Sequence, residues 1–127
     1  MDLTEVMLDI ARARTKERGV KNISFRTDDA QTLPFDQAEF DVVVCRLALQ
    51  HVQRPAKVVS GMTRVCRAGG TVLVEDIYGS EHSARAAYQD CWEILCDPSH
   101  VQTLPVSELL HIFREAGFGN RNSKYSG

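Results

Sequence analysis

The sequence has no apolar run long enough to cross a membrane, and no signal peptide opens it, so we expect a cytoplasmic chain without a membrane span. No charge of one sign dominates: the formal net charge is -2, which gives no electrostatic reason to expect nucleic acid as a partner. No Cys-x-x-Cys pair occurs among Cys45, Cys66, Cys91 and Cys96, so no metal site is expected. We interpret the four cysteines as small buried thiols in a reducing cytosol.

The glycines also form no cofactor motif. The sequence lacks the Gly-x-Gly-x-x-Gly pattern, which disfavours a dinucleotide-dependent oxidoreductase. The pair Gly69-Gly70 precedes a predicted strand instead of joining a strand to a helix N-terminus, so its geometry is wrong for a phosphate loop. With 43% hydrophobic and 25% charged residues the chain is ordinarily globular, and its length fits a single domain over residues 1–127.

Helices and strands alternate in the rest of the pattern. Helices are expected at residues 4–19, 55–66, 80–96 and 105–116, and strands at residues 22–26, 40–45 and 71–77. The Val-rich run 40–45 is typical of a strand buried on both faces, in a parallel sheet between helices. Chemistry in such folds gathers at the carboxyl ends of strands, so residues 27–30 and 46–51 are the expected site.

Apolar periodicity indicates which helix faces should be buried, and glycines indicate where the helices end. The first helix carries an apolar face formed by Leu3, Met7, Ile10 and Ala11, and the second one formed by Val58, Val59, Met62 and Val65. We expect the Gly69-Gly70 pair to end the second helix. In the third helix, core or lid packing is expected for Tyr88, Trp92 and Leu95.

Five short motifs follow one another along the chain: Asp29-Ala30, Leu33-Pro34-Phe35, Phe40-Asp41-Val42-Val43-Val44, Leu49-Gln50-His51 and Arg67-Ala68-Gly69-Gly70. Their order and spacing resemble class I S-adenosylmethionine-dependent methyltransferases, specifically the type 11 group that includes quinone-biosynthesis C-methyltransferases. The resemblance implies an α/β fold, a partial Rossmann-like methyltransferase fold with a mainly parallel sheet flanked by helices. It also implies methyl transfer from S-adenosylmethionine to a small-molecule acceptor.

The resemblance assigns five residues to the cofactor. Asp2 would accept from the ribose hydroxyls and Leu3 would pack on the adenine, although Asp2 could also be a frayed terminal residue. Asp29 would accept from the adenine amino group while the Ala30 N–H donates to a ring nitrogen; the alternative for Asp29 is an Asx turn. The backbone carbonyl of Arg46 would hold the ammonium group of the methionine end.

Two histidines are candidates near the acceptor. His51 could act as a general base, because imidazole titrates near neutral pH, although a lone His at a helix start is more often structural. His100 belongs to Asp97-Pro98-Ser99-His100-Val101, which resembles a segment that lies over the acceptor pocket in some relatives. The acceptor itself, whether a quinone ring, a sterol or a small acid, stays open.

The family's first strand, its Gly-rich loop and its closing antiparallel strands have no counterpart in the sequence. In the family's strand order, 3-2-1-4-5-7-6, the strands at 22–26 and 40–45 would flank a gap whose unpaired groups each cost ~1–3 kcal/mol. Three outcomes are open: the sheet contracts, a second copy pairs across the edge as a homodimer, or the chain is a truncated domain of a longer methyltransferase whose rest is supplied elsewhere, as by a complementing subunit. We therefore expect weak or no cofactor binding in isolation, and a non-catalytic interaction module is the alternative function.

Overall fold

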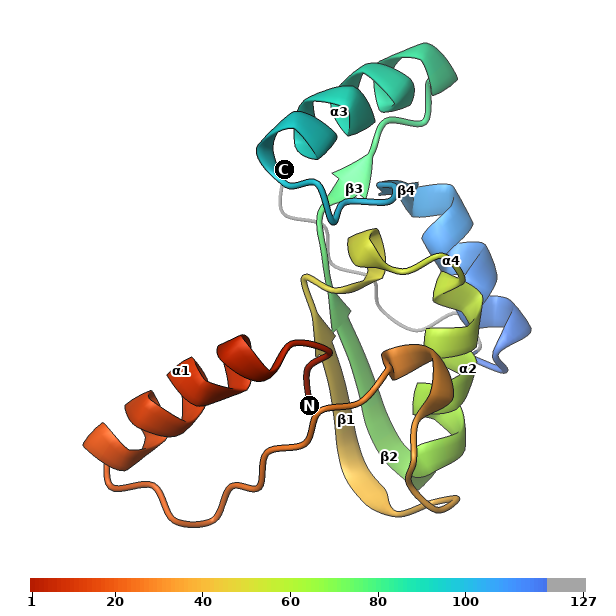
Figure 1. Ribbon diagram of the computed structural model, residues 1–127. Helices are drawn as coiled ribbons and strands as arrows, with labels where there is room; N and C mark the ends of the chain where they lie inside the picture. The colour runs from red at the N-terminus through yellow and green to blue at the C-terminus, as the bar shows by residue number, and fades with distance from the viewer. Residues whose placement is uncertain (119–127) are drawn as a thin grey trace.

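The computed structural model describes residues 1–118, in which helices and short strands alternate along the chain (Figure 1). The helices are α1 (Glu5–Glu17), α2 (Pro55–Val65), α3 (Ser83–Cys96) and α4 (Val106–Glu115), with two 3-10 turns, η1 (Ala30–Thr32) and η2 (Leu49–His51). The strands are β1 (Phe40–Arg46), β2 (Cys66–Glu75), β3 (Tyr78–Gly79) and β4 (Leu104–Pro105). The end of the domain predicted to reach residue 127 lies outside the described residues.

The centre of the fold is a parallel pair of strands, β1 and β2, as the sequence predicted. Their register runs from Val42 opposite Thr71 to Arg46 opposite Glu75. The prediction that the Gly69-Gly70 pair ends a helix is wrong: α2 ends at Val65, and both glycines lie inside β2. A Cβ on Gly70 would lie 2.7 Å from the Asp41 carbonyl oxygen, so glycine is required there because β1 passes too close for a side chain.

One face of this pair is covered by α2 and α4, which lie on the same side of the strands (Figure 1). Pro55 occupies the first turn of α2, and the predicted apolar stripe of that helix is fully confirmed as buried: Val58, Val59, Met62 and Val65. From the sheet, alternate residues point into the same core: Val43, Cys45, Val72 and Val74. This layer positions the carboxyl ends of both strands.

The opposite face of the strands is open, so the prediction that β1 is buried on both faces is wrong. Val42 and Val44 are 58% and 59% exposed, and Leu73 on β2 is 47% exposed. Within residues 1–118 no helix covers these side chains, because α1 projects away from the sheet (Figure 1).

The predicted strand at residues 22–26 does not form. The one isolated bridge among the described residues pairs Asp2 with Thr27, just after this segment, and Ile23 is 52% exposed. A strand is stable only when a neighbour satisfies its backbone groups, and β1 pairs with β2 alone among the described residues. The outcome in which the sheet contracts to pair residues 22–26 with β1 is therefore wrong.

Helices α1 and α3 are poorly covered, which corrects three predictions. The expected apolar face of α1 is exposed, and its one buried side chain is Leu8 instead. On α3 the side chains expected to pack in the core or under a lid, those of Tyr88, Trp92 and Leu95, do not lie in the core and are exposed, as are Cys91 and Cys96. The thiols of Cys45 and Cys66 are half-buried, so none of the four is fully buried. Among the described residues no helix has the length and apolarity needed to span a bilayer.

Candidate functional site

Asp2 is fixed against the loop that precedes Asp29. The Asp2 N–H donates to the Arg26 carbonyl (3.2 Å), and the Asp28 N–H donates to the Asp2 carbonyl (3.0 Å). The Asp2 side chain accepts from the Thr4 N–H through Oδ1 (2.8 Å), and within residues 1–118 its Oδ2 has no donor. Asp2 is therefore not a frayed end. Leu3 beside it is 71% exposed, which leaves an apolar surface available.

Asp29 caps the turn η1. Its Oδ1 accepts from the Gln31 N–H (2.8 Å), so the Asx-type contact that was the alternative interpretation is present. That bond uses one oxygen, and the second has only the long contact with the Gln31 side-chain amide at 3.4 Å. Ala30 begins the turn, where the backbone N–H has no partner within the helix. Asp29 can therefore cap η1 with one carboxylate oxygen and accept from a ligand with the other.

The loop after β1 is held by a carboxylate that sequence reasoning did not assign. Asp76 Oδ2 accepts from the backbone N–H groups of Ala48 (3.0 Å) and Leu49 (2.8 Å), and Oδ1 accepts from that of Ile77 (2.9 Å). Leu47 has a φ of 49°, a left-handed conformation that costs a non-glycine residue about 1–2 kcal/mol. Asp76 therefore stabilises a strained turn that directs the chain from β1 into η2.

Arg46 lies at the start of this turn. Its side chain donates through Nε to Glu75 Oε1 at 3.1 Å, and both side chains are exposed. The Leu47 N–H donates to the Glu75 carbonyl at 2.8 Å, which ties the end of β1 to the end of β2. The acidic pair at the end of β2 thus holds the loop: Glu75 pairs with Arg46 and Asp76 caps the turn.

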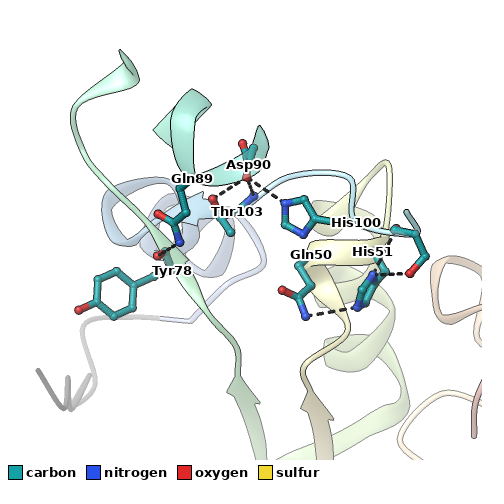
Figure 2. Close-up of polar contacts among 8 residues, drawn as sticks. Gln50, His51, Tyr78, Gln89, Asp90, His100 and Thr103 are labelled. Carbon is teal, nitrogen blue, oxygen red and sulfur yellow. Dashed lines mark hydrogen bonds and ion pairs between the residues drawn. The ribbon is translucent and has the colours of Figure 1, made fainter. Parts of the chain in front are cut away.

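The two candidate histidines lie together at this end of the sheet (Figure 2). Their ring centroids are 6.5 Å apart, and the two ring planes are nearly perpendicular. The Nε2 atom of His51 lies 3.2 Å from the side-chain nitrogen of Gln50, and its Nδ1 atom lies 3.1 Å from the Ser99 hydroxyl oxygen. The sequence placed His51 and His100 in different segments, and the structure brings them together.

His100 is buried, with its side chain only 1% exposed, and its Nε2 contacts Asp90 Oδ1 at 2.9 Å. The same Asp90 oxygen accepts from the Thr103 N–H and hydroxyl, both at 2.8 Å (Figure 2). Burial raises the pKa of Asp90, but the hydrogen bonds from His100 and Thr103 outweigh it and hold that pKa below its usual value. This network joins α3 to the segment before β4.

Other features of the described residues do not add to this site. No group of three possible metal ligands occurs among residues 1–118. An open hollow lies between η1 and α2, lined by residues that include Lys57 and Arg64, but none of the predicted site residues lines it. Burial and the negative charge of Asp76 raise the pKa of Cys45 to about 11, so its thiol is a poor nucleophile.

The residues present fit the adenosine end of S-adenosylmethionine better than its methionine end. Acceptor oxygens on Asp2 and Asp29 and the exposed Leu3 match a ribose and an adenine. A Gly-rich loop for the methionine end is not in the sequence, and the backbone near Arg46 is what this chain offers there.

Comparison with known proteins agrees with the fold. Residues 1–74 match the family model described as a methyltransferase domain. The chain is 33% identical over 113 residues to an uncharacterized methyltransferase of Bacillus subtilis, YcgJ, covering 89% of this chain and 45% of that protein. A solved structure from Bacillus halodurans C-125 is 35% identical, with a TM-score of 0.87 over 92% of this chain and 51% of that one. The predicted partial Rossmann-like α/β fold is confirmed.

A ubiquinone/menaquinone biosynthesis C-methyltransferase of Idiomarina loihiensis is 35% identical over 74 residues, 58% of this chain and 30% of that protein. The chain spans about half the length of the curated relatives that match it along most of its own length. The predicted methyltransferase family is confirmed by these matches. The chain belongs to the methyltransferase-domain family.

Proposed function

We propose that this chain supplies the adenosine-binding and acceptor-facing residues of an enzyme that methylates a small molecule. The observation that carries the proposal is the bridge between Asp2 and Thr27, which fixes Asp2 beside the loop that leads into Asp29. Two carboxylates far apart in the sequence are thereby held on adjoining backbone segments. The names of relatives such as the quinone-biosynthesis C-methyltransferase favour a small-molecule acceptor.

Each cofactor residue has a defined role in this proposal. The two oxygens of Asp2 accept from adjacent ribose hydroxyls, and the exposed Leu3 packs on the adenine ring. The Asp29 oxygen that does not cap η1 accepts from the adenine amino group, and the Ala30 N–H donates to the ring. The carbonyl of Arg46 accepts from the ammonium group. When bound, the cofactor supplies an electrophilic methyl group on its sulfonium.

The acceptor side is formed by the loops that carry His51 and His100. Positioning of the acceptor supplies most of the rate in such a displacement, because the methyl group is already activated. His51 is half-buried and can exchange a proton with an acceptor, whereas His100 is buried and held by Asp90. His100 would therefore shape the site beside His51, and both remain candidates for acceptor contact.

The test is calorimetric titration of the chain with S-adenosylhomocysteine, the product, using Asp29→Asn. Asparagine keeps an oxygen for the Gln31 N–H and so preserves the cap, but it replaces the second acceptor oxygen with a donor. A hydrogen bond to a charged group is worth about 1.5–3 kcal/mol, so affinity should fall about 10- to 100-fold. Asp36→Asn, on an exposed turn, is the matched control and should bind as the wild type does.

Two results would contradict this assignment. Equal affinity of Asp29→Asn and the wild type would remove Asp29 from the adenine site. A folded wild-type chain that binds no S-adenosylhomocysteine at millimolar concentration would mean that these residues do not hold the adenosine end on their own.

A second candidate function, a non-catalytic interaction module, is favoured by one observation. Within residues 1–118, the edge of β1 away from β2 has no strand partner, and Val42 and Val44 beside it are exposed. Sedimentation of the wild type against Val44→Lys tests pairing between copies, since a lysine should disperse a dimer that uses this edge. A stable dimer without methyl transfer would favour the module, and turnover by a monomer would exclude it.

A further inference from the structure

The contacts of His51 define which ring nitrogen carries its proton. Its Nδ1 lies 3.1 Å from the Ser99 hydroxyl and 3.2 Å from the Ser99 backbone carbonyl. The same hydroxyl lies 2.6 Å from Asp97 Oδ1, which also accepts from the Ser99 N–H at 2.9 Å. Asp97, Ser99 and His51 therefore form a hydrogen-bonded chain from a carboxylate to an imidazole.

The direction of each bond follows from what each group can donate. An ionised carboxylate only accepts, so the single hydroxyl hydrogen of Ser99 is directed at Asp97. An aspartate side chain is ionised near neutral pH, and the two hydrogen bonds from Ser99 hold the pKa of Asp97 below its usual value. Toward His51 the Ser99 hydroxyl can then only accept, and a carbonyl always accepts. Both contacts require the hydrogen of a neutral His51 to be on Nδ1.

The other ring nitrogen is left with its lone pair. Nε2 lies 3.2 Å from Gln50 Nε2, a donor to this lone pair that the methyl acceptor displaces before Nε2 takes its proton. His100 does not compete for this position, because its own Nε2 is engaged by Asp90 at 2.9 Å. The charged or titratable groups around the His51 ring are thus Asp97 on one side and the His100–Asp90 pair on the other.

We propose that Asp97 and Ser99 are positioning residues that hold His51 in the Nδ1–H tautomer and so reserve Nε2 to accept a proton from the methyl acceptor. This inference rests on the proposed function. It deepens that function by naming the acceptor class: a nucleophile that must lose a proton, such as a phenolic hydroxyl or an acidic carbon.

The proton and electron balance of such a step is complete. His51 Nε2 takes one proton from the nucleophilic atom of the acceptor, and the lone pair left on that atom forms the bond to the methyl carbon. The electron pair of the broken carbon–sulfur bond stays on sulfur, which loses its positive charge. The proton on Nε2 then leaves to solvent, which His51 reaches because its side chain is only half-buried.

Asp97→Ala and Asp97→Asn form a matched pair for the test. Both bonds from Ser99 end on the same Asp97 oxygen, Oδ1, so asparagine can retain both and alanine neither. In the alanine variant the freed hydroxyl of Ser99 can donate to Nδ1, which favours the opposite tautomer. The loop stays attached in either variant because the Val101 and Gln102 N–H groups both donate to the Gln50 carbonyl.

The measurement is the tautomer of His51 in the ligand-free chain, from long-range proton–nitrogen correlation spectra of histidine labelled with nitrogen-15. Spectra are taken at a pH where the rings are neutral, and His51→Gln identifies the signal. We expect the Nδ1–H form in the wild type and in Asp97→Asn, and a shift of roughly 3- to 10-fold toward Nε2–H in Asp97→Ala. Ser107→Ala, which removes a serine–carboxylate contact with Glu81 that involves no histidine, should leave the signal unchanged.

An Nε2–H wild type, or an unchanged tautomer in Asp97→Ala, would overturn the proposal. Because this readout needs neither cofactor nor acceptor, it is independent of the S-adenosylhomocysteine titration. A chain that fails that titration but shows the Nδ1–H tautomer keeps the positioning of His51 and loses only the cofactor assignment.

Discussion

Replacing Asp76 by alanine should destabilise the chain more than its half-buried position suggests. The carboxylate accepts from three backbone N–H groups, two of which, those of Ala48 and Leu49, belong to the loop after β1. A hydrogen bond to a charged group contributes about 1.5–3 kcal/mol. At the lower value, the two bonds from Asp76 to the loop after β1 contribute about 3 kcal/mol. Relaxation of Leu47, held at a φ of 49°, returns about 1 kcal/mol. The net loss is about 2 kcal/mol.

Urea unfolding followed by circular dichroism measures this loss. With a slope of about 1–3 kcal/mol/M, a loss of about 2 kcal/mol moves the midpoint down by roughly 1 M. Asp76→Asn keeps one acceptor oxygen and should lose less. The control is Asp41→Asn, which breaks an exposed ion pair with Arg67 at the other end of β1 and should cost about 0–1 kcal/mol. If Asp76→Ala unfolds at the same urea concentration as this control, the cap does not hold the loop and the reasoning is wrong.

Two pH dependences follow from the side-chain environments. Since the pKa of the Cys45 thiol is raised from 9.0 to about 11 by burial and by Asp76, the unfolded chain ionises first, and the free energy of unfolding should fall between those pH values. Cys45→Ala should show a shallower fall in alkaline urea titrations. The pKa of Asp90 is lowered from 3.8 by His100 and Thr103 despite burial, so its stabilising effect should persist above that pH and be lost below it. Acid unfolding should therefore be less steep in Asp90→Asn, and equal acid slopes would contradict the network.

Elements defined by local pattern could be predicted from the sequence. Helix α2 follows from Pro55 and an apolar stripe of period 3.6, and β1 follows from a β-branched run, because both signals act within a few residues. Residues 22–26 have an equally good strand pattern, but a strand also needs a neighbour, and periodicity does not say whether one exists. For the same reason periodicity could not tell whether the aromatic side chains of α3, for which core or lid packing was expected, lie in the core; they do not.

The sequence indicated candidate site residues but not the contacts that these residues make. The family motifs located Asp29 and His51, since these positions follow strands in a fixed order. The contact of His51 with Ser99 spans 48 residues, and that of Asp76 with Ala48 spans 28, so no local signal indicates either. That Asp76 accepts from backbone N–H groups is visible only in the structure.

The separation of α1 from the sheet has a thermodynamic consequence for ligand binding. This 13-residue helix is near the length at which helices are marginal in water, and one buried leucine adds little support. Asp2 and Leu3 lie just before it, so half of the proposed adenosine site belongs to the segment expected to open most readily. Part of the binding free energy of a ligand that contacts Asp2 must therefore offset the conformational entropy that this segment loses when it becomes ordered. Its binding should be accompanied by slower amide hydrogen exchange throughout α1, far from any atom that it touches.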